Sequence, residues 1–173
     1  MDTLSSLKLL DAELERLGVE RRLFICGGAA LILMKVTSRS TMDIDVLQPK
    51  VDQTLDQAAK LVAKKLGLSD SWLNNGPEDL LRYLDDQWEA NCSKVYDGHA
   101  LQVFALGRKD LIKSKLWAAC DRMDDIPDII ALKPTQEELQ EARSWVLQVD
   151  ASEVWPQIVE SCLKELERRR RDG

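Results

Sequence analysis

The chain has 173 residues, 45% apolar and 31% charged, which is the composition of a folded globular protein and excludes a disordered chain or a disulfide mini-protein. Its 24 Lys and Arg against 30 Asp and Glu give a net charge of −6, which argues against a protein that coats DNA or RNA but allows specific contact with RNA. The longest stretch without strongly polar side chains, residues 23–34, is too short to cross a bilayer. No signal peptide or CxxC pair is present, so we expect a reduced, cytoplasmic protein without membrane contact or structural zinc.

The first elements in the chain predict a strand, a glycine turn and a helix. Leucines recur every three or four residues over 4–17, which predicts an amphipathic helix. Residues 22–26 are apolar without a helical period and stop at Gly27-Gly28, so they predict a buried strand, and 29–34 predict a buried helix. Residues 42–47 alternate acidic and aliphatic side chains and predict a second strand with one polar and one buried face.

The remaining elements are mostly helices. Apolar spacing and a closing glycine predict a helix over 51–66, and Pro77 with the acids after it predicts another over 77–88. Asp97-Gly98 predicts a hairpin between two antiparallel strands, 93–96 and 99–106. The further helices are expected over 108–122, in a short piece after Pro127, in a segment capped by Thr135 with Glu138, and over 155–170.

These elements indicate an α+β fold with a small mixed sheet packed by helices and a helical C-terminal third. We place a soft boundary at Gly107. Residues 1–107 would form the core with its N-terminal helix, and 108–173 would pack on it within one structural domain.

Two aspartates on the second strand are the first candidate site residues. Alternate side chains of a strand share a face, so Asp43 and Asp45 point the same way about 7 Å apart while Ile44 and Val46 face the core. Paired carboxylates without a neighbouring cation are costly, and their oxygens suit Mg²⁺ or Mn²⁺. The alternative is a solvated edge-strand face.

The glycine pair complements these carboxylates. A turn without side chains that leads into a helix exposes backbone N–H groups, and such a turn can hold phosphate oxygens. Gly27 and Gly28 could also be an ordinary tight turn. Phosphates held next to a carboxylate-bound metal are the parts of a phosphoryl or nucleotidyl transfer site.

The order of these motifs resembles the DNA polymerase β-like nucleotidyltransferase superfamily, whose core is a strand, a Gly-Gly or Gly-Ser turn, a helix and a strand with Asp-x-Asp. Within it, the chain is similar to a minimal bacterial branch that includes the AbiEii-type toxins. Three motifs carry this likeness over residues 20–135, namely Arg39-x-Thr41-x-Asp43-x-Asp45, Lys115-Leu116-x-Ala118 and Arg122-x-x-Asp125-x-x-Asp128.

The resemblance implies roles for these residues. Asp43 and Asp45 would be catalytic metal ligands, and Lys115 would neutralise phosphate charge. The nucleotide-binding set would be Gly27, Gly28, Arg39, Thr41, Arg122, Asp125 and Asp128. The alternatives are that Arg39 and Thr41 are simple loop residues and that the later charged residues form ion pairs at an exposed helix end.

One feature departs from the family pattern. Fully active members carry a third carboxylate on a later strand, and we expect that position within 99–104, where Gln102 stands. A neutral amide is a poorer metal ligand and cannot act as a base, so Asp97, Asp125 and Asp128 are the candidate replacements.

The sequence therefore predicts a metal-dependent nucleotidyltransferase that moves an NMP from an NTP to a hydroxyl of RNA, protein or a small molecule. The resemblance also implies a toxin–antitoxin or defence role with a cognate protein partner. The alternative is a nucleotide-binding or partner-binding protein that kept the fold and lost catalysis, and a purely structural partner protein would require the motif match to be coincidental.

Overall fold

A computed structural model describes residues 1–172, and the chain divides into two compact units, Met1–Gly107 and Arg108–Gly173. The first unit contains a mixed sheet and the helices around it, and the second contains only helices. The α+β class predicted from the sequence is confirmed.

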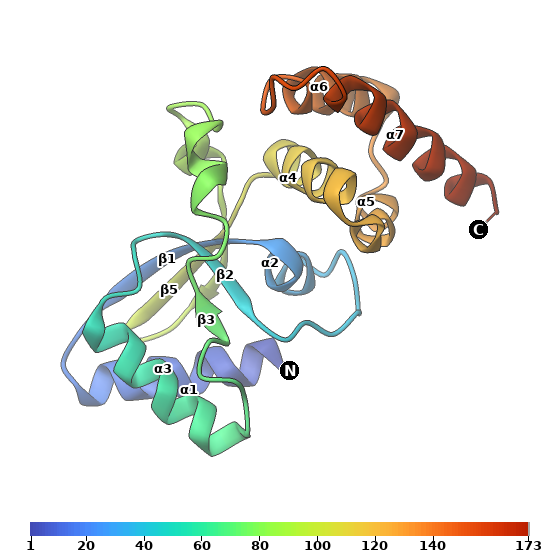
Figure 1. Ribbon diagram of the computed structural model, residues 1–173. Coiled ribbons are helices and arrows are strands. Elements are labelled where there is room, and N and C mark those ends of the chain that lie inside the picture. The colour runs from blue at the N-terminus through green and yellow to red at the C-terminus, as the bar shows by residue number, and fades with distance from the viewer. Residues whose placement is uncertain (173) are drawn as a thin grey trace. The chain divides into compact units, whose positions relative to one another are not determined.

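The sheet of the first unit has the strand order β3-β2-β1-β5-β4, with β1 at its centre (Figure 1). Strand β1 pairs antiparallel with β2 and parallel with β5, while β3 runs parallel to β2 and β4 antiparallel to β5. The strands are β1 (Arg21–Cys26), β2 (Ile44–Gln48), β3 (Leu73–Asn74), β4 (Ser93–Asp97) and β5 (Leu101–Ala105). The predicted β4–β5 hairpin around Asp97-Gly98 is confirmed.

Two helices, α1 (Thr3–Arg16) and α3 (Gln53–Leu66), lie side by side against one face of this sheet (Figure 1). That face is built from fully buried aliphatic side chains, including Leu23, Ile25 and Val103. Burial of such side chains contributes about 25 cal/mol per Å² of apolar surface, so this layer is the core of the unit. The short helix α2 (Gly27–Leu33) follows β1 directly, as predicted.

The segment before the hairpin differs from the prediction. The α-helix predicted over 77–88 is wrong, because the chain forms two short 3-10 helices there, η1 (Glu78–Arg82) and η2 (Trp88–Asn91). Only Leu80 of η1 and Trp88 of η2 are buried, so no apolar stripe fixes an α-helix to the core. The two-residue strand β3 was not predicted at all.

A buried carboxylate ties α1 to the hairpin turn. Asp11 on α1 is 7% exposed and accepts hydrogen bonds from the backbone N–H groups of Ala100 (2.7 Å) and His99 (3.1 Å) and from the Tyr96 hydroxyl (3.0 Å). Burial favours the neutral acid, but these donors outweigh it and hold the pKa of Asp11 below its ordinary value. Burial and the same hydrogen bond raise the pKa of Tyr96 to about 12.

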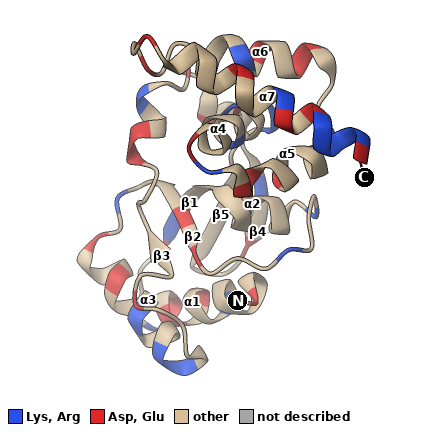
Figure 2. Cartoon of the chain, turned by 45° about the vertical axis from the view of Figure 1, so that its right-hand side comes forward, with Lys and Arg blue, Asp and Glu red and all other residues tan. Residues whose placement is uncertain are grey.

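The second unit consists of α4 (Arg108–Asp121), η3 (Met123–Asp125), α5 (Ile126–Leu132), α6 (Gln136–Val146) and α7 (Trp155–Asp172). Helix α4 packs against α6, and α7 contacts α4 and α5. The predicted capping box between Thr135 and Glu138 is present at the start of α6. Basic residues gather near the end of α7 (Figure 2), where Arg168 and Arg169 both pair with Glu165.

Within residues 1–172, no helix is long and apolar enough to cross a membrane. The four cysteines are present as thiols and not as disulfides, and three of them are buried.

We expect Asp11→Asn to lower the free energy of unfolding by about 2 kcal/mol at pH 7, because buried N–H donors lose their charged acceptor. Since the native pKa of Asp11 is depressed, its contribution is present above the unfolded pKa and is lost as the pH falls through the native pKa. Urea denaturation at several pH values measures this difference. Asp56→Asn, which removes an exposed pair with Lys60, is the control and should cost less than about 0.5 kcal/mol. Equal losses in both variants, or a difference that does not shrink in acid, would contradict the assignment.

Candidate functional site

The two candidate carboxylates sit where β2 begins. Asp45 lies on β2, and Asp43 precedes the strand by one residue. Ile44 and Val46 are fully buried while Asp43 and Asp45 are half-buried, so the predicted alternation of polar and apolar sides is confirmed. Both aspartates therefore project away from the aliphatic core.

The backbone at Gly27 and the backbone at Gly76 lie close to the Asp45 carboxylate on two sides. Gly27 has φ +69°, and a Cβ built there would collide with Asp45 Oδ2 and lie 3.3 Å from its carboxyl carbon. On the other side, a Cβ on Gly76 would lie 3.5 Å from Asp45 Oδ1. The carboxylate thus occupies a cradle that a side chain at Gly27 would fill.

Thr41 connects the glycine turn to the other carboxylate. Its hydroxyl lies 3.2 Å from Asp43 Oδ1 and 3.3 Å from the Asp43 carbonyl oxygen, and it donates to this residue. A Cβ on Gly28 would lie 3.2 Å from the same hydroxyl oxygen. The structure therefore brings together five residues predicted for the site: Gly27, Gly28, Thr41, Asp43 and Asp45.

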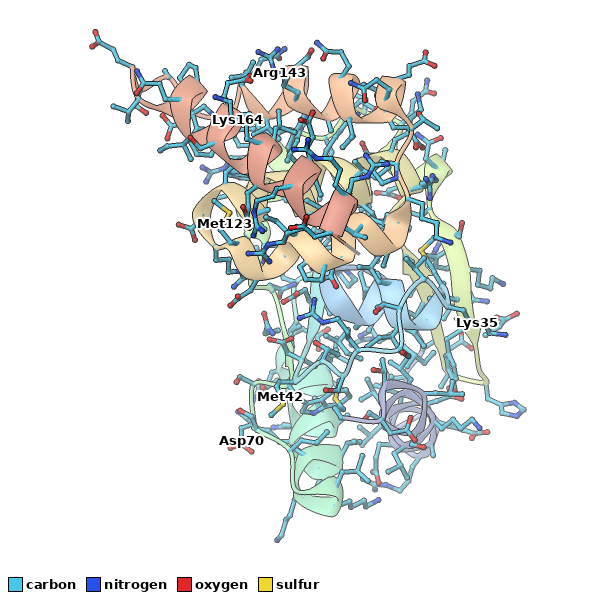
Figure 3. The ribbon with its side chains drawn as sticks, turned by 90° about the vertical axis from the view of Figure 1, so that its right-hand side faces the viewer. Lys35, Met42, Asp70, Met123, Arg143 and Lys164 are labelled. Atoms are coloured by element: carbon cyan, nitrogen blue, oxygen red, sulfur yellow. The ribbon has the colours of Figure 1, made fainter. Side chains whose placement is uncertain are left out.

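Arg39 lies in the exposed loop between α2 and β2. Its backbone N–H donates to the Thr37 hydroxyl at 3.2 Å. Met42, labelled in Figure 3, belongs to the same loop and is 79% exposed immediately before Asp43. The role of Arg39 in nucleotide binding stays a prediction.

Asn74 is a site neighbour that sequence reasoning missed. It stands on β3 directly opposite Asp45 in the parallel register, so both side chains project from the same face of the sheet. Its Oδ1 accepts the Gly76 N–H at 2.6 Å, on the same side of Gly76 as the Asp45 carboxylate. A two-residue strand has no periodicity, so no pattern in the sequence signals this placement.

The expectation that Gln102 stands near the third-acid position is wrong. Across the sheet, Asp45 pairs with Cys26, whereas Gln102 pairs with Arg22 on the far side of β1. Cys26 and Arg22 are four positions apart on β1, which is about 13 Å along the strand. The Gln102 amide instead donates to Asp97 Oδ1 at 2.9 Å.

The structure also places the proposed replacement acids. Asp97 pairs with Lys94 at the hairpin turn, and Asp125 and Asp128 belong to the helical unit. Over residues 1–172, no group of three or more His, Cys, Asp or Glu side chains is placed to hold a metal ion.

The residues present nevertheless fit a hard divalent cation. Asp43 and Asp45 offer hard oxygen donors, and the Gly27 cradle and the Thr41 hydroxyl help to position them. Mg²⁺ in proteins is commonly held by one or two carboxylates together with substrate phosphates and water, so two acids suffice.

The other charged candidates form a cluster of their own inside the helical unit. The Lys115 ammonium lies 2.7 Å from carboxylate oxygens of both Asp125 and Asp128, and Arg122 Nε lies 2.9 Å from Asp125. The side chains of Lys115, Asp125 and Asp128 are at most 10% exposed. We refer to Lys115, Arg122, Asp125 and Asp128 as the α4–α5 ion cluster.

This ion cluster balances two positive against two negative charges. Burial alone would lower the pKa of Lys115, but its two carboxylate partners outweigh burial and raise it. For Asp125, burial would raise the pKa, and Lys115 and Arg122 lower it instead. The charge of Lys115 is therefore matched within its own unit, and its predicted role at a phosphate stays a prediction.

We expect Lys115→Met to destabilise the protein by about 3 kcal/mol or more, because it leaves two buried carboxylates without their shared cation. Chemical denaturation measures the loss. Lys109→Met is the control, since Lys109 is 66% exposed in its pair with Glu141 and its removal should cost far less. A similarly small cost for both variants would show that the ion cluster does not hold α4 to α5.

Comparison with known proteins identifies one family. Residues 5–140 match the model of a family described as nucleotidyltransferase of unknown function (DUF6036). Neither a curated protein nor a solved structure gives a significant match. The matched range covers most of the chain and includes the glycine turn, Asp43 and Asp45, and the α4–α5 ion cluster. The chain therefore belongs to this nucleotidyltransferase family.

Proposed function

We propose that this protein is a metal-dependent nucleotidyltransferase that moves an NMP from an NTP to an acceptor hydroxyl. The observation that carries the proposal is the convergence of Asp43 and Asp45 on the Gly27-Gly28 turn in a member of a nucleotidyltransferase family. The family membership supports this class of reaction, and the convergence supports this location for it.

In this proposal, Asp43 and Asp45 hold Mg²⁺ or Mn²⁺. When bound, the ion polarises the phosphate oxygens and offsets the charge that develops at the α-phosphorus. Thr41 keeps the Asp43 carboxylate oriented through its hydrogen bond, and the bare backbone of Gly27 lets the Asp45 carboxylate approach the turn.

The glycine turn has the second role. With no side chain at Gly27 or Gly28, backbone N–H groups at the start of α2 can donate to oxygens of the triphosphate. The acceptor hydroxyl then loses its proton to solvent water and attacks the α-phosphorus. A new P–O bond forms as the bond from the α-phosphorus to the β-phosphate oxygen breaks, and pyrophosphate leaves with the electrons of the broken bond. Holding the two reactants in line is the main contribution that such a site makes.

A second candidate function rests on the side chain next to Asp45. The neighbouring strand offers the neutral amide of Asn74, and residues 1–172 contain no group of three acids placed to hold a metal ion. A protein that binds nucleotide on this fold and catalyses weakly or not at all would be built in this way. Transfer of labelled NMP to any acceptor would exclude this alternative.

The finer expectations rest on the sequence resemblance. They are the AbiEii-like branch, a toxin–antitoxin or defence context, a cognate protein partner and a cytoplasmic location.

We expect Asp45→Asn to abolish Mg²⁺-dependent NTP binding while leaving the fold intact, because the variant replaces a carboxylate ligand by an amide of the same shape. Isothermal titration of each of the four NTPs, with and without Mg²⁺, measures this. Asp70→Asn, at an exposed position labelled in Figure 3, is the charge-matched control and should bind as the wild type does. Unchanged NTP binding by Asp45→Asn would contradict the assignment of the metal site to Asp45. No NTP binding by the wild type would favour a partner-binding protein.

Gly27→Ala tests the cradle separately from the charge. The new Cβ would push the Asp45 carboxylate away, so we expect loss of Mg²⁺-dependent NTP binding with a backbone cost of about 1–2 kcal/mol. Gly67→Ala is the matched control, because Gly67 has φ +65° and open space around its Cβ position. Gly67→Ala should have the same backbone cost and still bind NTP in the presence of Mg²⁺. Equal NTP binding by both variants would therefore contradict the role of Gly27.

A further inference from the structure

Arg22 at the start of β1 is stacked on two aromatic rings. Its guanidinium carbon lies 4.3 Å from the ring centroid of Phe104 on β5 and 5.0 Å from that of Phe24 on β1. The two rings are themselves stacked, with centroids 5.4 Å apart and planes 30° apart. The rings attract the cation electrostatically and hold the guanidinium group over their faces.

The guanidinium is not used by the protein for an ion pair. Among residues 1–172, no carboxylate lies within ion-pair distance of Arg22, and none of its side-chain donors makes a hydrogen bond. Its neighbour Arg21, by contrast, pairs with Asp52 at 2.7 Å. Arg22 is also exposed, so its guanidinium group is accessible to a ligand.

Two further side chains adjoin these residues. Lys94 on β4 lies 5.8 Å from the Phe104 centroid and is 41% exposed in its pair with Asp97. Trp88 packs edge-on against Phe24, with centroids 5.2 Å apart, and fixes that ring from the other side. We call Arg22, Phe24, Phe104 and Lys94 the Arg22 platform.

The Arg22 platform lies on the same face of the sheet as Asp45. Arg22, Phe24 and Cys26 are every second residue of β1, so their side chains share one face of the sheet. Cys26 is the register partner of Asp45. Arg22 and the register partner of Asp45 are therefore four positions apart along β1, which is about 13 Å. A single phosphate group held at Asp45 therefore cannot also touch Arg22.

We propose that the Arg22 platform binds a single-stranded nucleic acid, which serves as the acceptor. A base stacks on the open face of the guanidinium, and the adjoining phosphate accepts hydrogen bonds from its free N–H groups and from Lys94. Arginine combines these two tasks because its planar fork both stacks and binds phosphate. The acceptor role rests on the proposed function, whereas the binding itself does not.

The net charge of −6 limits the strength of this interaction. Two cations on one small platform give few phosphate contacts, so binding should be modest and confined to a short site. For two contacts with a single strand, log K should fall with log salt with a slope of about −1.4.

Binding is measured by the fluorescence anisotropy of a labelled oligoadenylate in EDTA with the full chain, at low salt and over a salt series. We expect Arg22→Ala to weaken binding about tenfold and to reduce the salt slope by about 0.7. Arg22→Lys should restore the slope but not the full affinity, since an ammonium keeps the charge and loses the stacking plane. Arg16→Ala is the matched control, because Arg16 is exposed on α1, which covers the opposite face of the sheet.

The outcomes separate this inference from the proposed function. No oligoadenylate binding by the wild type, or equal losses in Arg22→Ala and Arg16→Ala, would overturn the inference. An unchanged salt slope in Arg22→Ala would also overturn it, because it would mean that Arg22 makes no contact with a phosphate of the nucleic acid. Since EDTA removes metal-dependent NTP binding, failure here leaves the Asp45 test untouched, and failure of that test leaves this one untouched.

Discussion

The site depends on the absence of one side chain. Gly27 ends the central strand with a positive φ, and its bare Cα faces the Asp45 carboxylate. The position of that Cα is fixed by β1, which is bonded on both sides, and the position of Asp45 is fixed by its register with Cys26. Any other residue at Gly27 would have to displace either the carboxylate or the middle of the sheet, so the turn and the acid are one structural unit.

The sequence patterns that the structure confirms are local ones. The Asp97-Gly98 hairpin, the Thr135 capping box and the alternation from Asp43 to Val46 each depend on residues within a few positions of one another. Strand β3 could not be found in this way, because two residues show no period. Its place is fixed by distant groups, such as the buried Trp72 indole that donates to the Ala59 carbonyl at 2.9 Å.

Charged residues show the same limit. A sequence motif predicts Lys115 as a site residue, and the structure shows it buried between two aspartates. No sequence pattern predicts Arg22 as a site residue, because its partner Phe104 comes from another strand. A sequence gives the number and order of the cations, but only the packing determines which of them are already matched and which have donors left for a ligand.

The Asp11 contact has a consequence for how the chain is made. It joins α1 to Ala100, residues 89 positions apart, and β5 supplies the last neighbour of the central strand. During synthesis, α1, β1 and β2 emerge first and leave one edge of β1 without a partner until Leu101–Ala105 has left the ribosome. The sheet unit therefore cannot close gradually from its N-terminus. A nascent chain that stalls before Leu101 presents an open hydrophobic strand edge, and protection against aggregation comes only with the completed hairpin.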